Sequence, residues 1–184
     1  GAELVAYSGF SASNYLQQPY NSDLDFGTGD LSIIFWYKLT STGTSQCFIH
    51  RGDGGSGTWG SGPIIQIEMD TLHLDFQLAA SGFTSFDEVK VPVATSVTGE
   101  WQHFVGVRKG GRMHMYIDGV KYGNTASTRD LSNTAATTWI GQRPNASRPL
   151  SNGSMALLRM STSVPTAEQI KKMYEDEKVL FQEN

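Results

Sequence analysis

Two alternating segments joined by a Gly-Gly turn constrain the fold of this chain more than any other feature. Trp101–Arg108 and Arg112–Ile117 alternate in the period-two pattern of a half-buried β-strand. Gly110 and Gly111 stand between them, and Asp118-Gly119 follows, where a positive φ costs little. The pattern therefore predicts an antiparallel hairpin that ends in a second tight turn.

The alternation also assigns the hairpin side chains to faces, because successive residues of a strand point to opposite sides of a sheet. One face of the first strand is expected to carry Trp101, His103, Val105 and Val107, and one face of the second Met113, Met115 and Ile117.

Composition agrees with one β-rich domain spanning residues 1–184. The 184 residues are 39% hydrophobic and 17% charged, enough to bury a sizeable core. The 20 glycines are spread between short apolar runs, which favours many tight turns over a helical bundle.

Charge and hydropathy exclude two classes of partner. A formal net charge of −4 argues against general binding to nucleic acid or to anionic membranes. No apolar run approaches the roughly 20 residues that cross a bilayer, so we expect no membrane insertion.

Further runs bounded by Gly, Asn, Pro or Ser predict more strands. They lie at about Leu4–Tyr7, Asn14–Gln18, Leu31–Leu39, Gln46–His50, Pro63–Met69, Leu72–Leu78, Glu88–Val93, Thr137–Gly141 and Ser154–Met160. With the hairpin they make roughly a dozen short strands, which is enough for two facing antiparallel sheets.

One helix is indicated near the C-terminus. Thr166 and Gln169 have the spacing of a capping box, and an apolar stripe of Ile170, Met173 and Tyr174 follows. We expect a short helix that caps one edge of the sandwich.

The hairpin resembles the one found in laminin-G-like, concanavalin A-like lectin and glucanase jelly rolls, which has a Trp-x-His start and a Tyr-x-Asp-Gly end. Here these residues are Trp101, His103, Tyr116, Asp118 and Gly119. Asn14–Pro19, Asp23–Trp36, Trp139–Gly141 and Leu157–Glu168 are similar to the opening and close of such domains. The resemblance spans about Leu4–Lys178 and implies an all-β, antiparallel two-sheet jelly roll that binds carbohydrate or protein.

Ser22–Asp30 and Tyr174–Lys178 further resemble laminin-G-like domains of marine bacteriophage structural proteins. This resemblance implies a tail or virion protein, or another extracellular assembly, that recognises a host cell-surface glycan. Virion protein subunits or copies of the same chain are then expected partners. We also expect this domain to be excised from a longer chain.

Residues Glu68–His73 partly resemble the Glu-x-Asp-x-x-Glu motif of laminarinase-like hydrolases. Glu68 and Asp70 match its first two acids, but His73 stands where the third acid should donate a proton. We therefore predict no catalytic residues and expect these three to be ordinary exposed strand residues.

Metal and cofactor chemistry has one candidate. Asp23, Asp25 and Asp30 lie in a Gly-containing turn that can present oxygens to calcium, yet Asp also caps backbone at such turns. No cofactor is required by any motif, and calcium stays an open alternative. Cys47, the single cysteine, is expected to be a buried small hydrophobe.

Two loops provide the candidate ligand-binding residues. Arg51–Gly62 is Gly-rich and carries Asp53 and Trp59, the combination of a hydrogen-bond acceptor and an aromatic platform for a sugar ring. Gln142–Pro149 adds Arg143, Asn145 and Arg148, which suit acidic sugars. The alternative is that both loops are solvated connections, with Trp59 folded back onto the sandwich.

The sequence thus predicts a non-catalytic module for carbohydrate or cell-surface recognition. The principal alternative is a structural or oligomerisation domain of a virion protein that has no sugar site. A polysaccharide hydrolase or lyase is the third interpretation.

Overall fold

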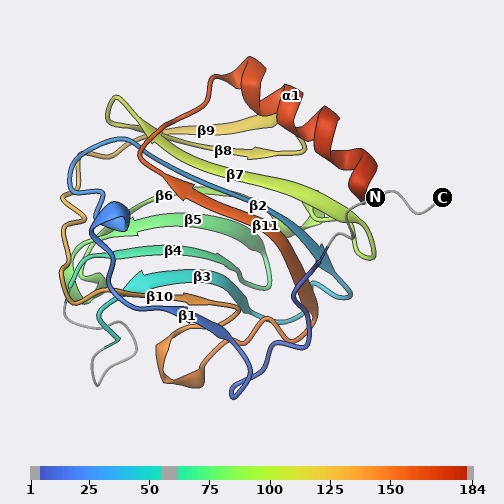
Figure 1. Ribbon diagram of the computed structural model, residues 1–184, viewed down its shortest axis with the longest axis horizontal. Helices are drawn as coiled ribbons and strands as arrows, with labels where there is room; N and C mark the ends of the chain where they lie inside the picture. Colours follow the sequence, from blue (N-terminus) through green and yellow to red (C-terminus); the bar gives the residue numbers. More distant parts are fainter. Residues whose placement is uncertain (1–4, 55–61, 182–184) are drawn as a thin grey trace.

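The computed structural model describes residues 5–54 and 62–181 as two antiparallel sheets packed face to face, with one helix against the outside (Figure 1). The strands are β1 (Leu16–Gln18), β2 (Leu31–Leu39), β3 (Gln46–Gly52), β4 (Ile64–Met69), β5 (His73–Ala79), β6 (Phe86–Pro92), β7 (Trp101–Lys109), β8 (Arg112–Ile117), β9 (Val120–Ala126), β10 (Thr137–Ile140) and β11 (Gly153–Ser161). The helix is α1 (Ala167–Glu177), and short 3-10 turns are η1 (Ser22–Leu24), η2 (Ser81–Phe83), η3 (Val93–Thr95), η4 (Pro144–Ala146) and η5 (Lys178–Leu180).

The first sheet has six strands in the order β1-β10-β3-β4-β5-β6, and the second has five in the order β11-β2-β7-β8-β9. All pairings between neighbouring strands are antiparallel. Since β2 lies between β11 and β7, chain-distant segments form the centre of the second sheet. This is the jelly-roll sandwich that the sequence predicts.

The main core fills the space between the sheets. Phe35 stacks on Phe104 at 4.7 Å between ring centroids, and Phe48 of the facing sheet lies 5.6 Å from Phe35. The same cluster contains Ile49, Ile65, Ile67, Phe76 and the methionines of β8. β2 is buried along almost its whole length, as expected of a central strand covered on both faces.

The predicted hairpin is confirmed as β7 and β8, with Gly110 and Gly111 at positive φ in the turn. Phe104 pairs with Ile117 across the strands, so the methionine face of β8 points into the main core. Val105 and Val107 point to the opposite side of the same sheet, where they join Tyr116 in a second cluster. The two predicted apolar faces of the hairpin therefore serve two different cores.

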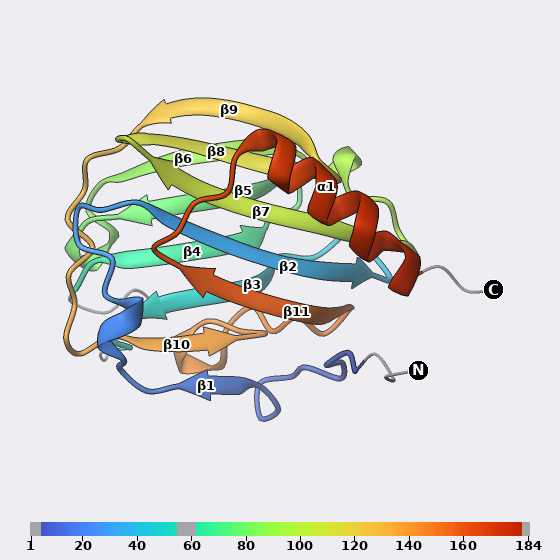
Figure 2. The same cartoon turned by 45° about the horizontal axis from the view of Figure 1, so that its top comes forward.

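Helix α1 covers the second of these cores. Ile170 is fully buried against Ile34, Val105 and Val107, and the helix lies across the five-stranded sheet (Figure 2). The prediction that α1 caps an edge is wrong, because its apolar stripe packs on a sheet face. The Thr166–Gln169 capping box is present. Within the part of the chain that the structure describes, no helix is long and apolar enough to cross a membrane.

One predicted strand is absent from the part of the chain that the structure describes, and one observed strand was not predicted. In the described part of Leu4–Tyr7 only Tyr7 pairs, through a single bridge to Met155. The edge strand β9 was missed, because it is largely exposed and has Gly123 at φ 69° in place of an apolar alternation.

One buried cation ties the loops at the end of the sandwich together. Arg108 is fully buried at the end of β7, and its guanidinium donates hydrogen bonds to three backbone oxygens. The acceptors are Gly27 at 2.7 Å, Gly29 at 2.8 Å and Arg129 at 2.6 Å. Arg108 thus fixes the segment that enters β2 against the segment that follows β9.

Candidate functional site

The outer face of the six-stranded sheet carries a row of polar side chains instead of apolar ones. His50, Gln66, Gln77 and Glu88 stand opposite one another on β3, β4, β5 and β6. Gln66 contacts the His50 ring nitrogen Nδ1 at 3.0 Å and donates to Gln77 at 3.1 Å, and Gln77 donates to Glu88 at 3.3 Å. The register therefore builds a hydrogen-bonded polar surface across four strands.

Burial shifts the titration of two groups on this face. Desolvation lowers the pKa of His50 to about 4, so the ring is neutral near pH 7. Desolvation, with the negative charges of Asp70 and Glu88 added, raises the pKa of Asp75 to about 7.

A buried ion-pair cluster lies one row along the same face. Glu68 follows Gln66 by two residues on β4, which places their side chains about 7 Å apart on one side. Its carboxylate accepts hydrogen bonds from Arg143 and, at 2.7 Å, from Arg148. The prediction that Glu68 is an ordinary exposed residue is wrong: its side chain is only 6% exposed. Asp70 instead closes the β4–β5 turn by accepting from the backbone of Leu72 and His73.

The structure brings together two of the residues predicted to bind ligand. Arg143 and Arg148 meet at Glu68, where Arg143 is 3% exposed and Arg148 is 35% exposed. Arg143 is therefore a buried structural partner, and Arg148 is the one that reaches solvent. Asn145 lies between them in η4, with its side chain outside the described part.

The other predicted loop begins beside the same face. Asp53 accepts a hydrogen bond at 2.8 Å from the backbone of Gly62 and so closes the loop between them. Trp59 lies outside the described residues. Trp139 stands opposite His50 on β10, and a Cβ built on Gly54 would come within 2.3 Å of its indole. Gly54 is needed there because its backbone lies directly against the ring. We call the surface formed by Asp53, Trp139, Glu68, Arg143 and Arg148 the loop face.

Two of the three aspartates considered for calcium, Asp25 and Asp30, have other partners. Asp25 binds the buried guanidinium of Arg51 at 3.2 Å and the backbone of Asn133 at 2.9 Å. Asp30 accepts from the backbone of Gly110. Within residues 5–54 and 62–181, no three His, Cys, Asp or Glu side chains are grouped to hold a metal ion. The two aspartates therefore have the capping and bridging role that the sequence left open.

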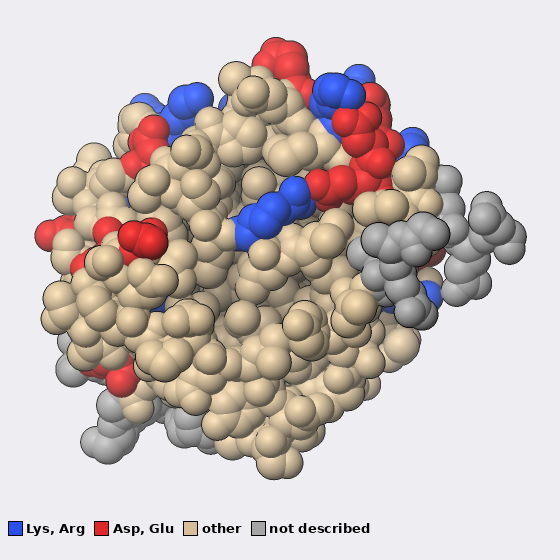
Figure 3. Space-filling view, in the orientation of Figure 1, with Lys and Arg blue, Asp and Glu red and all other residues tan. Residues whose placement is uncertain are grey.

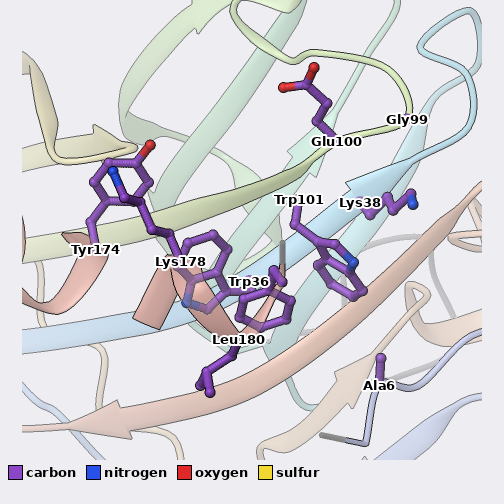
Figure 4. Close-up of a pocket in the computed structure, with 10 residues that line it drawn as sticks. Ala6, Trp36, Lys38, Gly99, Glu100, Trp101, Tyr174, Lys178 and Leu180 are labelled. Atoms are coloured by element: carbon purple, nitrogen blue, oxygen red, sulfur yellow. The ribbon is translucent and has the colours of Figure 1, made fainter. Parts of the chain in front are cut away.

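A cleft that the sequence did not predict lies beside α1 on the five-stranded sheet. We call it the helix-face cleft: it has a volume of about 590 Å³ and is lined by Trp36, Trp101, Tyr174, Phe181, Lys38, Glu100, Lys178, Gly99, Ala6 and Leu180 (Figure 4). Its walls come mainly from β2, β7, α1 and the segment after α1. The alternation of Trp101 and His103 predicted only that they share one face of a strand. The packing of α1 and the segment after it on that face brings Tyr174 and Phe181 to the cleft.

Beneath this cleft, His103 is fully buried between Trp36 and Tyr174, with ring centroids 5.1 and 6.3 Å away. Neither of its ring nitrogens has a hydrogen-bond partner among the described residues. Desolvation lowers its pKa to about 4, so the ring is a neutral packing element here. The histidine of the hairpin motif is therefore structural.

Comparison with known structures gives the same architecture. A botulinum neurotoxin serotype D ligand-binding domain, solved in complex with N-acetylneuraminic acid, superposes with a TM-score of 0.68 at 13% identity, over 94% of this chain and 42% of that one. The receptor-binding domain of the neurotoxin C/D mosaic serotype gives a TM-score of 0.64 at 15% identity, over 91% and 41%. The heptameric SAP-like pentraxin of Limulus polyphemus gives 0.62 at 16% identity, over 94% and 82%. The chain thus spans about two fifths of the neurotoxin chains.

No curated protein sequence matches the chain. A laminin-G-type family model, described as the concanavalin A-like lectin/glucanases superfamily, matches residues 10–171. That range runs from Phe10, in the core between the sheets, to Lys171 in α1, and so includes all eleven described strands, from β1 to β11, with the complete hairpin. The chain belongs to the concanavalin A-like lectin/glucanases superfamily.

Proposed function

We propose that this domain is a non-catalytic module that binds carbohydrate at the loop face. The observation that carries the proposal is the partly exposed Arg148 guanidinium, anchored on the buried carboxylate of Glu68. The Nη1 atom of Arg148 donates to Glu68, and the planar guanidinium group has further N–H groups to donate to a ligand. An arginine already held in place loses little side-chain entropy when it binds.

Other residues of the loop face are proposed to take part in sugar binding. Asp53 places a carboxylate at the start of the other predicted loop, and Trp139, only 8% exposed, packs against His50 and Gly54 and supports this face from within. We infer that Trp59 and Asn145 complete this site as stacking platform and amide contact. Arg143 contributes from below, because it holds Glu68 in position.

A positively charged fork favours sugars that carry a carboxylate. The serotype D neurotoxin domain, which shares this fold, was solved with N-acetylneuraminic acid, a sugar of that class. We therefore expect sialic acids and uronates to bind better than neutral sugars.

The setting we propose is an extracellular assembly, with a bacteriophage virion or tail as the specific case. Its support is the sequence resemblance over Ser22–Asp30 and Tyr174–Lys178. In that setting the domain, a single unit over residues 1–184, recognises a host cell-surface glycan, needs no cofactor and contacts virion subunits or copies of itself.

The Arg148→Gln variant tests the site. Glutamine keeps much of the side-chain length but removes the charge and the fork, so binding to acidic glycans is expected to fall about tenfold to hundredfold. The measurement is a glycan array followed by titration calorimetry with the best ligand. Arg112→Gln, on the other sheet, is the matched control and should bind normally. Unchanged binding by the Arg148 variant would remove the loop face from the site.

Hydrolysis is expected to be absent. Both carboxylate oxygens of Glu68 are held by arginines, so this acid is not free to attack a sugar. Incubation with β-glucans, agars, carrageenans and alginates should release neither reducing ends nor unsaturated products. Turnover that disappears in Glu68→Gln would refute the non-catalytic assignment.

A second candidate function, self-assembly, is favoured by one apolar surface. Tyr7 is 54% exposed and Leu16 is 37% exposed beside a cavity of about 300 Å³ lined by Phe10, Ile140 and Met155. In Figure 3 the charged side chains gather mainly around the helix, and the region below it carries few. A mass above that of one chain in light scattering, reduced by Leu16→Asp, would support an assembly role.

A further inference from the structure

We propose that the helix-face cleft is a second saccharide site, so that the domain presents one sugar-binding surface on each of its two sheets. The cleft shares no residue with the loop face, and its position on the five-stranded sheet makes it independent of the function proposed above.

Strand register builds the floor of the cleft. Trp36 and Lys38 alternate onto the outer face of β2, and Trp101 of β7 stands directly opposite Lys38. The turn before β7 is held to the end of β2 by a hydrogen bond from Gly99 to Leu39. Trp101 is therefore positioned by two strands of a regular sheet, a more rigid support than a loop.

Helix α1 and the segment after it add the remaining aromatic walls. Phe181 stacks on Trp36 with 4.4 Å between ring centroids and lies 4.8 Å from Trp101. Tyr174 lies 5.9 Å from Trp36 on its other side. The Trp101, Tyr174 and Phe181 side chains each remain partly exposed, so aromatic surface faces the hollow.

The aromatic wall is also anchored from behind. The Trp36 indole N–H donates to Glu177 at 2.7 Å, and Glu177 is held in turn by Arg159 at 2.7 Å. Trp36 is almost fully buried by these contacts. The wall is thus formed before any ligand arrives, which lowers the entropic cost of binding.

Polar groups of both signs surround the aromatic walls. In Figure 4, Lys38 and Lys178 lie on opposite sides of Trp36 and Trp101. Glu100 lies above them, in the turn that leads into β7. Flat apolar rings combined with a few hydrogen-bond donors and acceptors match a pyranose ring, whose C–H face stacks while its hydroxyls bond at the rim. Lys178 lies over the Tyr174 ring, with 5.5 Å between Nζ and the ring centroid. A fatty tail would make no use of Lys38 and Glu100, and a purely anionic ligand would be opposed by Glu100.

The size of the cleft agrees with this class of ligand. Its volume of about 590 Å³ lies inside the range of roughly 300 to 1,000 Å³ that is usual for small-molecule sites. We therefore expect the cleft to take a short oligosaccharide segment rather than a single small ion.

The tryptophans themselves provide the test, because Trp36 and Trp101 report on the cleft and Trp139 reports on the loop face. Indole N–H resonances are followed by two-dimensional NMR during titration with glucose-, galactose- and uronate-containing oligosaccharides. Saturable shifts at Trp101 and Trp36 are expected.

Trp101→Ala should weaken this binding at least about tenfold, and so should Lys38→Met combined with Glu100→Gln, which keeps every aromatic ring. Phe86→Ala, an exposed aromatic on β6, is the matched control and should leave the affinity unchanged.

Three outcomes would overturn the proposal. One is a shift confined to Trp139, which would leave sugar binding at the loop face alone. Another is an unchanged Trp101 response in the Lys38 and Glu100 double variant, together with a folded Trp101→Ala protein that still binds. The third is saturation of the cleft by a tryptophan-containing peptide but by no saccharide in the panel, which would make it a protein-binding surface. In Arg148→Gln, the Trp139 response at the loop face should be lost. Persistent shifts at Trp36 and Trp101 in that variant would show that the cleft binds sugar independently of the loop face.

Discussion

Replacing Glu68 by alanine is expected to lower the free energy of unfolding by about 3 to 5 kcal/mol. The reason is that Arg143 is 3% exposed and would keep its charge in a buried position without the carboxylate that compensates it. Arg148 loses the same partner but is more exposed, so water can solvate it. Denaturation with urea, followed by tryptophan fluorescence, measures the change.

A double variant separates charge from packing in this cluster. Glu68→Met with Arg143→Met removes both charges and keeps apolar volume, so it should recover a large part of the stability lost in Glu68→Ala. Glu175→Ala breaks a surface pair with Lys171 and should change stability by less than about 0.5 kcal/mol. A Glu68→Ala protein as stable as Glu175→Ala would contradict the view that this ion pair supports the loop face.

Replacing Arg108 by methionine is expected to cost about 3 to 5 kcal/mol of stability. The side chain is fully buried, and three carbonyl oxygens would lose a charged donor at once. Thermal and urea unfolding of the variant should show the loss, with weakened protection from hydrogen exchange around Gly27–Gly29 and Arg129.

Arg112→Met is the control for this experiment, since Arg112 is exposed at the start of β8 in the same hairpin. Its stability should stay within about 0.5 kcal/mol of the parent protein. If the Arg108 variant lost as little stability as Arg112→Met, water or neighbouring donors would have to satisfy the three carbonyls. The hydrogen bonds of Arg108 would then contribute little to the free energy of unfolding.

Local alternation predicted most of the fold. Ten of the eleven strands correspond to predicted segments, because Gly, Asn and Pro mark their ends and β-branched or aromatic residues fill them. β9 was missed since an edge strand with few buried side chains has no alternation to detect. The placement of α1 was wrong for a different reason: its stripe shows that one side is buried, but not which surface buries it.

The candidate sites were less accessible to sequence analysis. Arg143 and Arg148 look equivalent in the sequence, and only their meeting at Glu68 makes one buried and the other available. Glu68 itself was considered only as part of a hydrolase motif, although an acid that alternates with isoleucines can equally face a covering loop. The helix-face cleft combines Trp36, Trp101 and Phe181 from distant parts of the chain, and no spacing rule connects them.

The contact between Trp36 and Glu177 has a consequence for synthesis of the protein in the cell. The two residues are 141 positions apart, so at roughly 5 to 20 residues per second the ribosome needs on the order of ten seconds to supply the second after the first. During that delay Ile34, and later Val105 and Val107, have no helix to cover them. A nascent chain stalled before Ile170 should therefore recruit chaperones or aggregate, whereas one released after α1 has emerged can bury that surface at once.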